Sequence, residues 1–142
     1  MLGRKSERMA SQAIRRLIEA IGYPEGVPEG EGVVVLRVDG ERVRVAELGG
    51  QLVLSKVLDR AEEDLGALAG FAVGRMLREE AVLAWDAREE AVILWQGVPV
   101  GMGAEGLRLF FEAFMDSCDW WQERATALHA PPPAFPQMVI HP

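Results

Sequence analysis

Three short runs of strand-forming residues, separated by two glycine turns, constrain the fold of this chain more than any other feature. Asp39-Gly40 suits a type I′ hairpin turn, in which both central residues need a positive φ angle. Gly49-Gly50 marks a second tight turn. The runs therefore predict an antiparallel meander with one buried and one solvated face. The expected strands are Val33–Val38, Arg42–Leu48 and Gln51–Val57.

Amphipathic helices are predicted before and after this meander. Apolar residues between Ser6 and Ile21 recur every three or four positions, which is typical of a helix with one buried face. The order α-β-β-β-α-β-β-α predicts a single α+β domain over residues 1–128, with an antiparallel sheet packed against helices. The expected helices are Ser6–Ile21, Asp59–Glu80 and Ala104–Leu128, and the further strands are Ala81–Asp86 and Ala91–Gln96.

The last residues and the overall charge limit the function. Residues 129–142 are rich in proline, which predicts an extended or disordered tail. A net charge of −7, from 15 basic and 22 acidic residues, disfavours nucleic-acid binding, which relies on clustered cations. No apolar run is long enough to span a bilayer or to form a secretory signal, and a single cysteine forms no internal disulfide. We therefore expect a cytoplasmic protein that binds neither nucleic acid nor membrane.

Three glycines in the second predicted helix share one face. Gly66, Gly70 and Gly74 fall at every fourth position, and an interior glycine costs a helix about 1 kcal/mol relative to alanine. Their presence predicts that another backbone approaches closely. That backbone belongs either to the sheet or first helix of the same chain, or to a second subunit, and the sequence leaves both open.

One glycine motif resembles a phosphate-binding loop. Residues Gly101 to Gly106 match the pattern G-x-G-x-x-G, follow a predicted strand and open a predicted helix. Glu105 would place a negative charge at the anion site, and no parallel strand follows to bring an acidic residue to a ribose. A glycine-rich connection between strand and helix is therefore the favoured interpretation.

No catalytic residue, metal or cofactor is predicted. His129 and His141 lie near the end of the chain and have no ligand spacing with Cys118. Cys118 itself falls within an apolar helical stripe, which is typical of inert packing. A carboxylate site assembled from residues distant in the sequence stays open as an alternative, because spatial neighbours are not visible in a sequence.

The four tryptophans are candidates for core or interface positions. Trp85 and Trp95 lie in consecutive predicted strands, and the turn between the strands allows both to lie on one face. A position in the core or at a subunit interface is favoured over a ligand site. Trp120 and Trp121 point about 100° apart on a helix, so one of them should be partly exposed. An exposed tryptophan is typical of a protein-binding hot spot.

The C-terminal half carries a resemblance to a known family. The stretch AVLAWDAREEAVILWQGVPVGMGAEGLRLFFEAFMDSCDWWQERA contains two strands around an acidic turn, a V-P-V-G segment and a long helix with D-W-W. With DGERVRVAELGGQLVLSKVL as a looser match, the chain resembles the type III secretion chaperones of the Tir chaperone class, and stand-alone bacterial proteins of that fold, over about Ser6–Ala127. The resemblance implies a small acidic homodimer that holds an extended segment of a client protein.

We therefore expect a non-enzymatic domain whose partners are a second copy of itself and a client polypeptide. The alternatives are a small-molecule-binding protein or small enzyme, and a subunit permanently joined to a partner. The expected client contacts are Val34, Leu36, Val53, Trp120 and Trp121. The expected dimer contacts are Gly66, Gly70, Gly74, Trp85 and Trp95.

Overall fold

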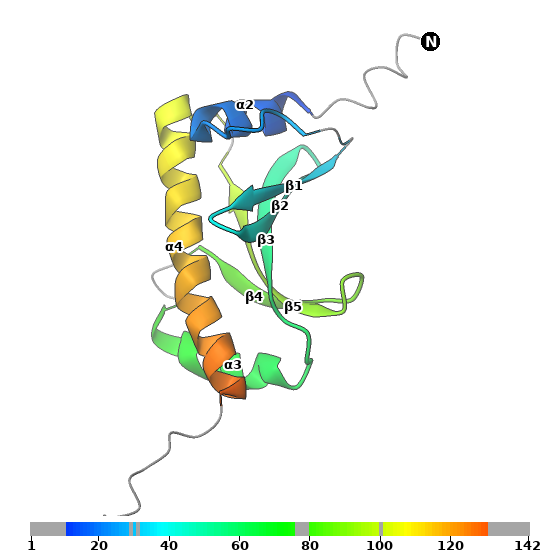
Figure 1. The fold of residues 1–142 in the computed structure, drawn as a ribbon, viewed down its shortest axis with the longest axis vertical. Helices are drawn as coiled ribbons and strands as arrows, with labels where there is room; N and C mark the ends of the chain where they lie inside the picture. Colours follow the sequence, from blue (N-terminus) through cyan, green and yellow to red (C-terminus); the bar gives the residue numbers. More distant parts are fainter. Residues whose placement is uncertain (1–10, 29, 31, 76–79, 100, 131–142) are drawn as a thin grey trace, which may run out of the picture.

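The computed structural model describes residues 11–28, 30, 32–75, 80–99 and 101–130. They form one five-stranded antiparallel sheet with two helices packed on one of its faces and a third helix at one end (Figure 1). This confirms the predicted α+β class. The helices are α2 (Gln12–Ile21), α3 (Asp64–Arg75) and α4 (Ala104–His129). The strands are β1 (Val33–Val38), β2 (Glu41–Leu48), β3 (Gln51–Asp59), β4 (Val82–Asp86) and β5 (Ala91–Val98). Within these ranges, no helix is both long and apolar enough to cross a membrane.

The sheet has the strand order β1-β2-β3-β5-β4, so β1 and β4 lie at its edges. The predicted β1–β2 turn is confirmed, because Asp39 and Gly40 have φ angles of 51° and 79°. Gly49 and Gly50 also have positive φ angles at the β2–β3 turn. The N-terminal meander is therefore joined to the β4–β5 hairpin through the β3–β5 pair.

The residues at the two ends of α2 favour the start and the end of a helix. The side chain of Ser11 accepts a hydrogen bond from the backbone N–H of Ile14, and Gly22 ends the helix in a left-handed conformation with φ 66°. Besides the buried apolar side chains of α2, two hydrogen bonds join this helix and the residues after it to the rest of the domain. Arg16 donates a 2.7 Å hydrogen bond to the carbonyl of Met102, and the Tyr23 hydroxyl accepts one from the backbone N–H of Arg37.

The start of α3 differs from the prediction of a helix beginning at Asp59. Asp59 is instead the last residue of β3, where its backbone pairs with Val92. Its carboxylate accepts a 2.9 Å hydrogen bond from the backbone N–H of Ala61, which favours a turn over helix at this point. The helix begins five residues later, at Asp64. Residues 76–79 of the second predicted helix, residues 6–10 of the first and residues 131–142 of the predicted tail lie outside the described residues. Glu80, the predicted end of the second helix, lies instead in a bend before β4.

The core lies between the sheet and the helices α2 and α4. Its side chains come from alternate strand positions and from one stripe of each helix, as the sequence periods predict. Burying one large apolar side chain contributes about 1.5–3 kcal/mol, so this layer dominates the stability of the fold. The largest fully buried side chains include Trp121, Phe114, Ile14, Leu17, Ile18, Leu36, Leu54, Leu68 and Leu94.

Candidate protein-binding site

The face of the sheet opposite the helices, here called the outer face, is rich in exposed apolar side chains. No described helix covers it (Figure 1). Val33 and Val35 are each 41% exposed, and Val82 and Trp95 are each 36% exposed. The pairing register places one row across all five strands of this face, consisting of Val35, Arg44, Ser55, Trp95 and Val82.

The outer face also carries cationic side chains and a hollow. Arg37 and Arg42 are exposed and directly opposite each other on β1 and β2. Two like charges directly opposite each other repel. An acidic side chain of a binding partner would therefore make a favourable contact with this pair. A hollow of about 280 Å³ lies next to Arg42. Its lining includes apolar and basic side chains and also acidic ones: Val35, Val57, Ile93, Arg42, Arg44, Lys56, Arg60, Glu41, Asp86 and Glu89.

The predicted client contacts lie in different environments. Val34, Leu36 and Trp121 are 3%, 0% and 1% exposed, so their side chains belong to the core of this protomer. Strand alternation explains the first two, because Val34 and Leu36 point to the helix side while Val33 and Val35 point outward. Val53 is half-buried on the outer face, opposite Ala46 and Gly97.

The two adjacent tryptophans differ in exposure, as their spacing predicts. Trp121 is buried, whereas Trp120 is half-buried and meets it edge to face with 4.9 Å between ring centroids. The guanidinium groups of Arg75 and Arg124 lie over the Trp120 ring, at 4.0 Å and 3.9 Å from its centroid. Cation–π contacts of this kind contribute about 0.5–2 kcal/mol, so Trp120 helps to hold α3 against α4.

The exposed side of α3 is apolar and rich in glycine. A side chain added at Gly66 or Gly70 would meet no atom of the described residues within 4 Å, so close packing against this part of the protomer does not require glycine at either position. Gly74 lies on the same helix. The neighbouring Phe71 and Val73 are 50% and 76% exposed. Packing against the sheet or against the described part of the first helix, one of the two explanations that the sequence leaves open, therefore does not account for Gly66 and Gly70.

Trp85 and Trp95 lie on opposite faces of the sheet, so the shared face that the sequence allows is not formed. Trp85 pairs with Val92 and packs against the core, whereas Trp95 pairs with Val82 on the outer face. The reason is the length of the turn. Asp86 pairs with Ala91, and the four residues between them place positions 85 and 95 out of phase.

A groove runs between the end of α2, the β1–β2 turn and α4. It has a volume of about 510 Å³. Its apolar floor includes Phe111 and Met115, and its walls carry more acidic than basic groups. The acidic residues that line it are Asp39, Glu41, Glu112, Asp116 and Asp119, and the basic ones are Arg37 and Arg108.

The glycine motif and the cysteine lie in structural positions. Gly103 is the N-cap of α4, and Glu105 in the first turn is bound by Arg108, which lowers the pKa of Glu105. The negative charge of Glu105 in this first turn disfavours a phosphate at the helix N-terminus. Cys118 is fully buried, and burial raises its pKa to about 12. Its thiol is therefore protonated at neutral pH and is a poor nucleophile.

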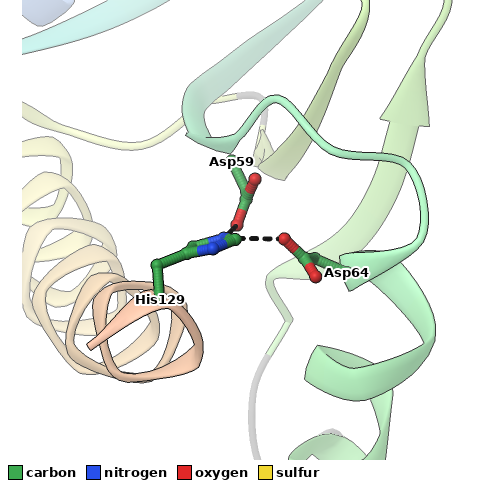
Figure 2. Close-up of side chains that lie close together, drawn as sticks. All are labelled: Asp59, Asp64 and His129. Carbon is green, nitrogen blue, oxygen red and sulfur yellow. Dashed lines mark hydrogen bonds and ion pairs between the residues drawn. The ribbon is translucent and has the colours of Figure 1, made fainter. Parts of the chain in front are cut away.

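One cluster of titratable side chains has no local signal in the sequence. His129, at the end of α4, places Nε2 2.9 Å from Oδ2 of Asp59 and 2.7 Å from Oδ2 of Asp64 (Figure 2). The hydrogen bond with Asp59 and the charges of both carboxylates raise the pKa of His129. Burial and the neighbouring Asp59 raise the pKa of Asp64. Asp59 and His129 are 70 residues apart, so no spacing in the sequence predicts their contact.

Comparison with solved structures shows that this α+β domain has the fold of the type III secretion chaperones. A chain of the HopA1-SchA chaperone–effector complex superposes with a TM-score of 0.60 at 14% identity, covering 78% of this chain and 90% of the other. For the ExsC-ExsE complex the TM-score is 0.59 at 21% identity, covering 79% and 92%. For the ExoT-SpcS complex from Pseudomonas aeruginosa the values are 0.58 and 17%, covering 76% and 92%.

The likeness is one of structure rather than of sequence. No protein-family model matches the chain, and no curated protein matches it in sequence. The solved structures named above therefore support the fold, whereas the function is inferred from the surfaces of this chain.

Proposed function

We propose that the protein is a non-enzymatic, chaperone-like homodimer that holds an extended segment of a client polypeptide on its outer face. The observation that carries the proposal is the exposure of Val33 and Val35 on β1, and of Trp95 and Val82 on β5 and β4, on a face that no described helix covers. Exposed apolar side chains gathered on one face are typical of protein-binding sites. Similarity to chains from chaperone–effector complexes gives the proposal a precedent in the same fold.

The chemistry of the outer face defines the client. Apolar side chains at alternate strand positions fit an extended segment whose own apolar residues alternate. The edge strand β1 offers backbone groups along which such a segment can add as a further strand. Arg37 and Arg42 beside this edge favour acidic residues in the segment. The expected client is therefore an extended polypeptide with alternating apolar and acidic side chains.

Selection from a library of random 16-residue peptides tests this proposal, with affinities measured by fluorescence anisotropy. The selected peptides should show alternating apolar residues with Asp or Glu. Val35→Glu should weaken their binding at least about tenfold, because it places a charge among the exposed apolar side chains and repels acidic residues. Leu109→Glu is the matched control, since Leu109 is 52% exposed on α4. Equal affinities for the two variants, or no enrichment of any sequence, would rule out the outer face as the client site.

The proposed dimer contact is the apolar side of α3. Phe71 and Val73 supply exposed apolar area, and Gly66 and Gly70 allow a second backbone to approach closely. Trp95 remains a proposed contact at the neighbouring hairpin, whereas Trp85 contributes mainly to the core. The proposed partner of this surface is the same surface of a second copy of the chain, because most homodimers form through one self-complementary surface.

Sedimentation velocity at micromolar concentration tests the dimer. Wild-type protein should sediment as a dimer of the 15.6 kDa chain. Gly70→Leu should sediment as a monomer, because its side chain keeps the two helices apart. Gly103→Leu is the control, because Gly103 also has open space around it but lies at the start of α4. A wild-type monomer at this concentration would contradict the proposed dimer while leaving the client site to its own test.

A further inference from the structure

Three potential metal ligands from distant parts of the chain converge at the lower end of α4 in Figure 1. Asp59 ends β3, Asp64 begins α3 and His129 ends α4. Their side chains point toward one another (Figure 2). One oxygen of each carboxylate and a ring nitrogen of the histidine all lie within 4.8 Å of one another. The fold thus places a nitrogen and two oxygen ligand atoms around a single point.

The three side chains do not satisfy one another by hydrogen bonding alone. Nε2 of His129 can carry one hydrogen, yet it faces Oδ2 of Asp59 at 2.9 Å and Oδ2 of Asp64 at 2.7 Å. Its hydrogen bond is with Asp59. Among the described residues, the buried Oδ2 of Asp64 has no hydrogen-bond partner of good geometry, although Nε2 of His129 lies 2.7 Å from it. A buried carboxylate oxygen without a donor is costly, and a bound cation removes that cost.

We propose that His129, Asp59 and Asp64 form a binding site for a divalent transition metal ion, with Zn²⁺ as the best-fitting ion. One imidazole nitrogen and two carboxylate oxygens suit Zn²⁺, which binds both at about 2.0–2.2 Å. Tetrahedral ligands at those distances lie about 3.3 Å apart, so the present contacts need to widen by about half an ångström. His129 can supply this movement, because its side chain is 58% exposed. Its exposure also leaves the fourth position open to water.

The surroundings of Asp59 fit the role of a ligand. Its side chain is only 8% exposed, and its second oxygen, Oδ1, accepts a 2.9 Å hydrogen bond from the backbone N–H of Ala61. A hydrogen bond to the non-ligating oxygen orients a carboxylate toward a metal. The ion would join the end of α4 to the β3–α3 connection. The site therefore predicts metal-dependent stability of the domain rather than catalysis.

Isothermal titration of chelator-treated full-length protein with Zn²⁺ tests the site, together with thermal unfolding. One equivalent of Zn²⁺ should bind per chain and raise the unfolding temperature, whereas Mg²⁺ should do neither, because it prefers six oxygen ligands. His129→Gln and Asp64→Asn should each weaken Zn²⁺ binding by about 100-fold or more. Even replacing a residue that only hydrogen-bonds to a metal ligand typically lowers metal affinity by about 10–100-fold. His141→Gln is the matched control and should bind Zn²⁺ as wild type does.

Two results would overturn the metal site. The first is Zn²⁺ binding that is absent from the wild type or unchanged in His129→Gln. The second is a lower unfolding temperature in both variants with no effect of Zn²⁺ on the wild type, which would make the cluster an ion-pair network only. Circular dichroism of the two variants separates lost binding from lost folding. Neither result bears on the proposed client site, which lies on a different face of the domain.

Discussion

Lys56 donates a 2.7 Å hydrogen bond to the side-chain oxygen of Gln122, joining β3 to α4 inside the protein. Lys56 is only 7% exposed and points toward the helices from a strand whose neighbouring inward residues are leucines. A carboxylate oxygen of Glu41 lies 3.8 Å from its ammonium group. Buried charges are tolerated only where such partners exist, so this small polar network specifies how α4 lies on the sheet.

Replacing Gln122 by leucine should destabilise the fold. The ammonium group of Lys56 would lose its shortest hydrogen bond while staying buried, which costs about 1–3 kcal/mol. Urea-induced unfolding followed by circular dichroism measures the change. Gln12→Leu is the matched control, because Gln12 is exposed at the start of α2 and should change the free energy of unfolding by less than about 0.5 kcal/mol. Equal effects of the two substitutions would contradict a structural role for the Lys56–Gln122 bond.

Cys118 should be unreactive in the folded protein. Its pKa is raised by burial from 9.0 to about 12, and no part of its side chain is exposed. A disulfide reagent at pH 8 should therefore label the thiol only after unfolding in urea. Rapid labelling of the native protein would contradict the buried position of Cys118.

The same shift gives a pH dependence with a definite sign. Between about pH 9 and pH 12 the unfolded thiol loses its proton while the folded thiol keeps it. The unfolded state then binds fewer protons, so the contribution of Cys118 to stability falls as the pH rises through this range. Urea unfolding of wild type and Cys118→Ala at pH 8 and pH 10 isolates the effect. From pH 8 to pH 10 the free energy of unfolding of the wild type should fall relative to that of Cys118→Ala.

The two adjacent tryptophans should differ in their contribution to stability. Trp121→Ala should cost about 3–5 kcal/mol, because it leaves a large cavity in the core. Trp120→Ala should cost about 1–2 kcal/mol, because it removes contacts with Arg75 and Arg124 from a half-buried position. Denaturant midpoints of the two variants compare these costs directly. A greater loss in Trp120→Ala than in Trp121→Ala would mean that the helix is rotated relative to the structure described above.

Periodicity explains why most of the fold is predictable from the sequence. The alternation around Val43 and Val45 and the three- and four-residue spacing through Leu17 each match the side that becomes buried. The boundary at Asp59 is not predictable in this way. Acidic residues after it favour a helix start, but pairing of β3 with β5 extends the strand first. Tertiary pairing thus overrides the local preference.

The candidate sites depend on information that a single sequence does not carry. The choice between Val34 and Val35 as a surface residue depends on which face the helices cover, since both are apolar. The opposite positions of Trp85 and Trp95 depend on the number of residues in one turn. The contact between Asp59 and His129 depends on how α4 lies across the sheet, because no sequence spacing links residues so far apart.

Hydrogen exchange of the protein with and without a selected peptide tests the central claim, that a client polypeptide is held on the outer face beside β1. The backbone amides of Val33 and Val35, which face the open edge of β1, should become protected when the peptide binds, because an added strand takes up their hydrogen bonds. The edge-facing amide of Arg37 already donates to Tyr23 and should change less. Amides of α4 near Phe111 should exchange as before. Protection confined to the groove beside α4, or no change along β1, would contradict the account.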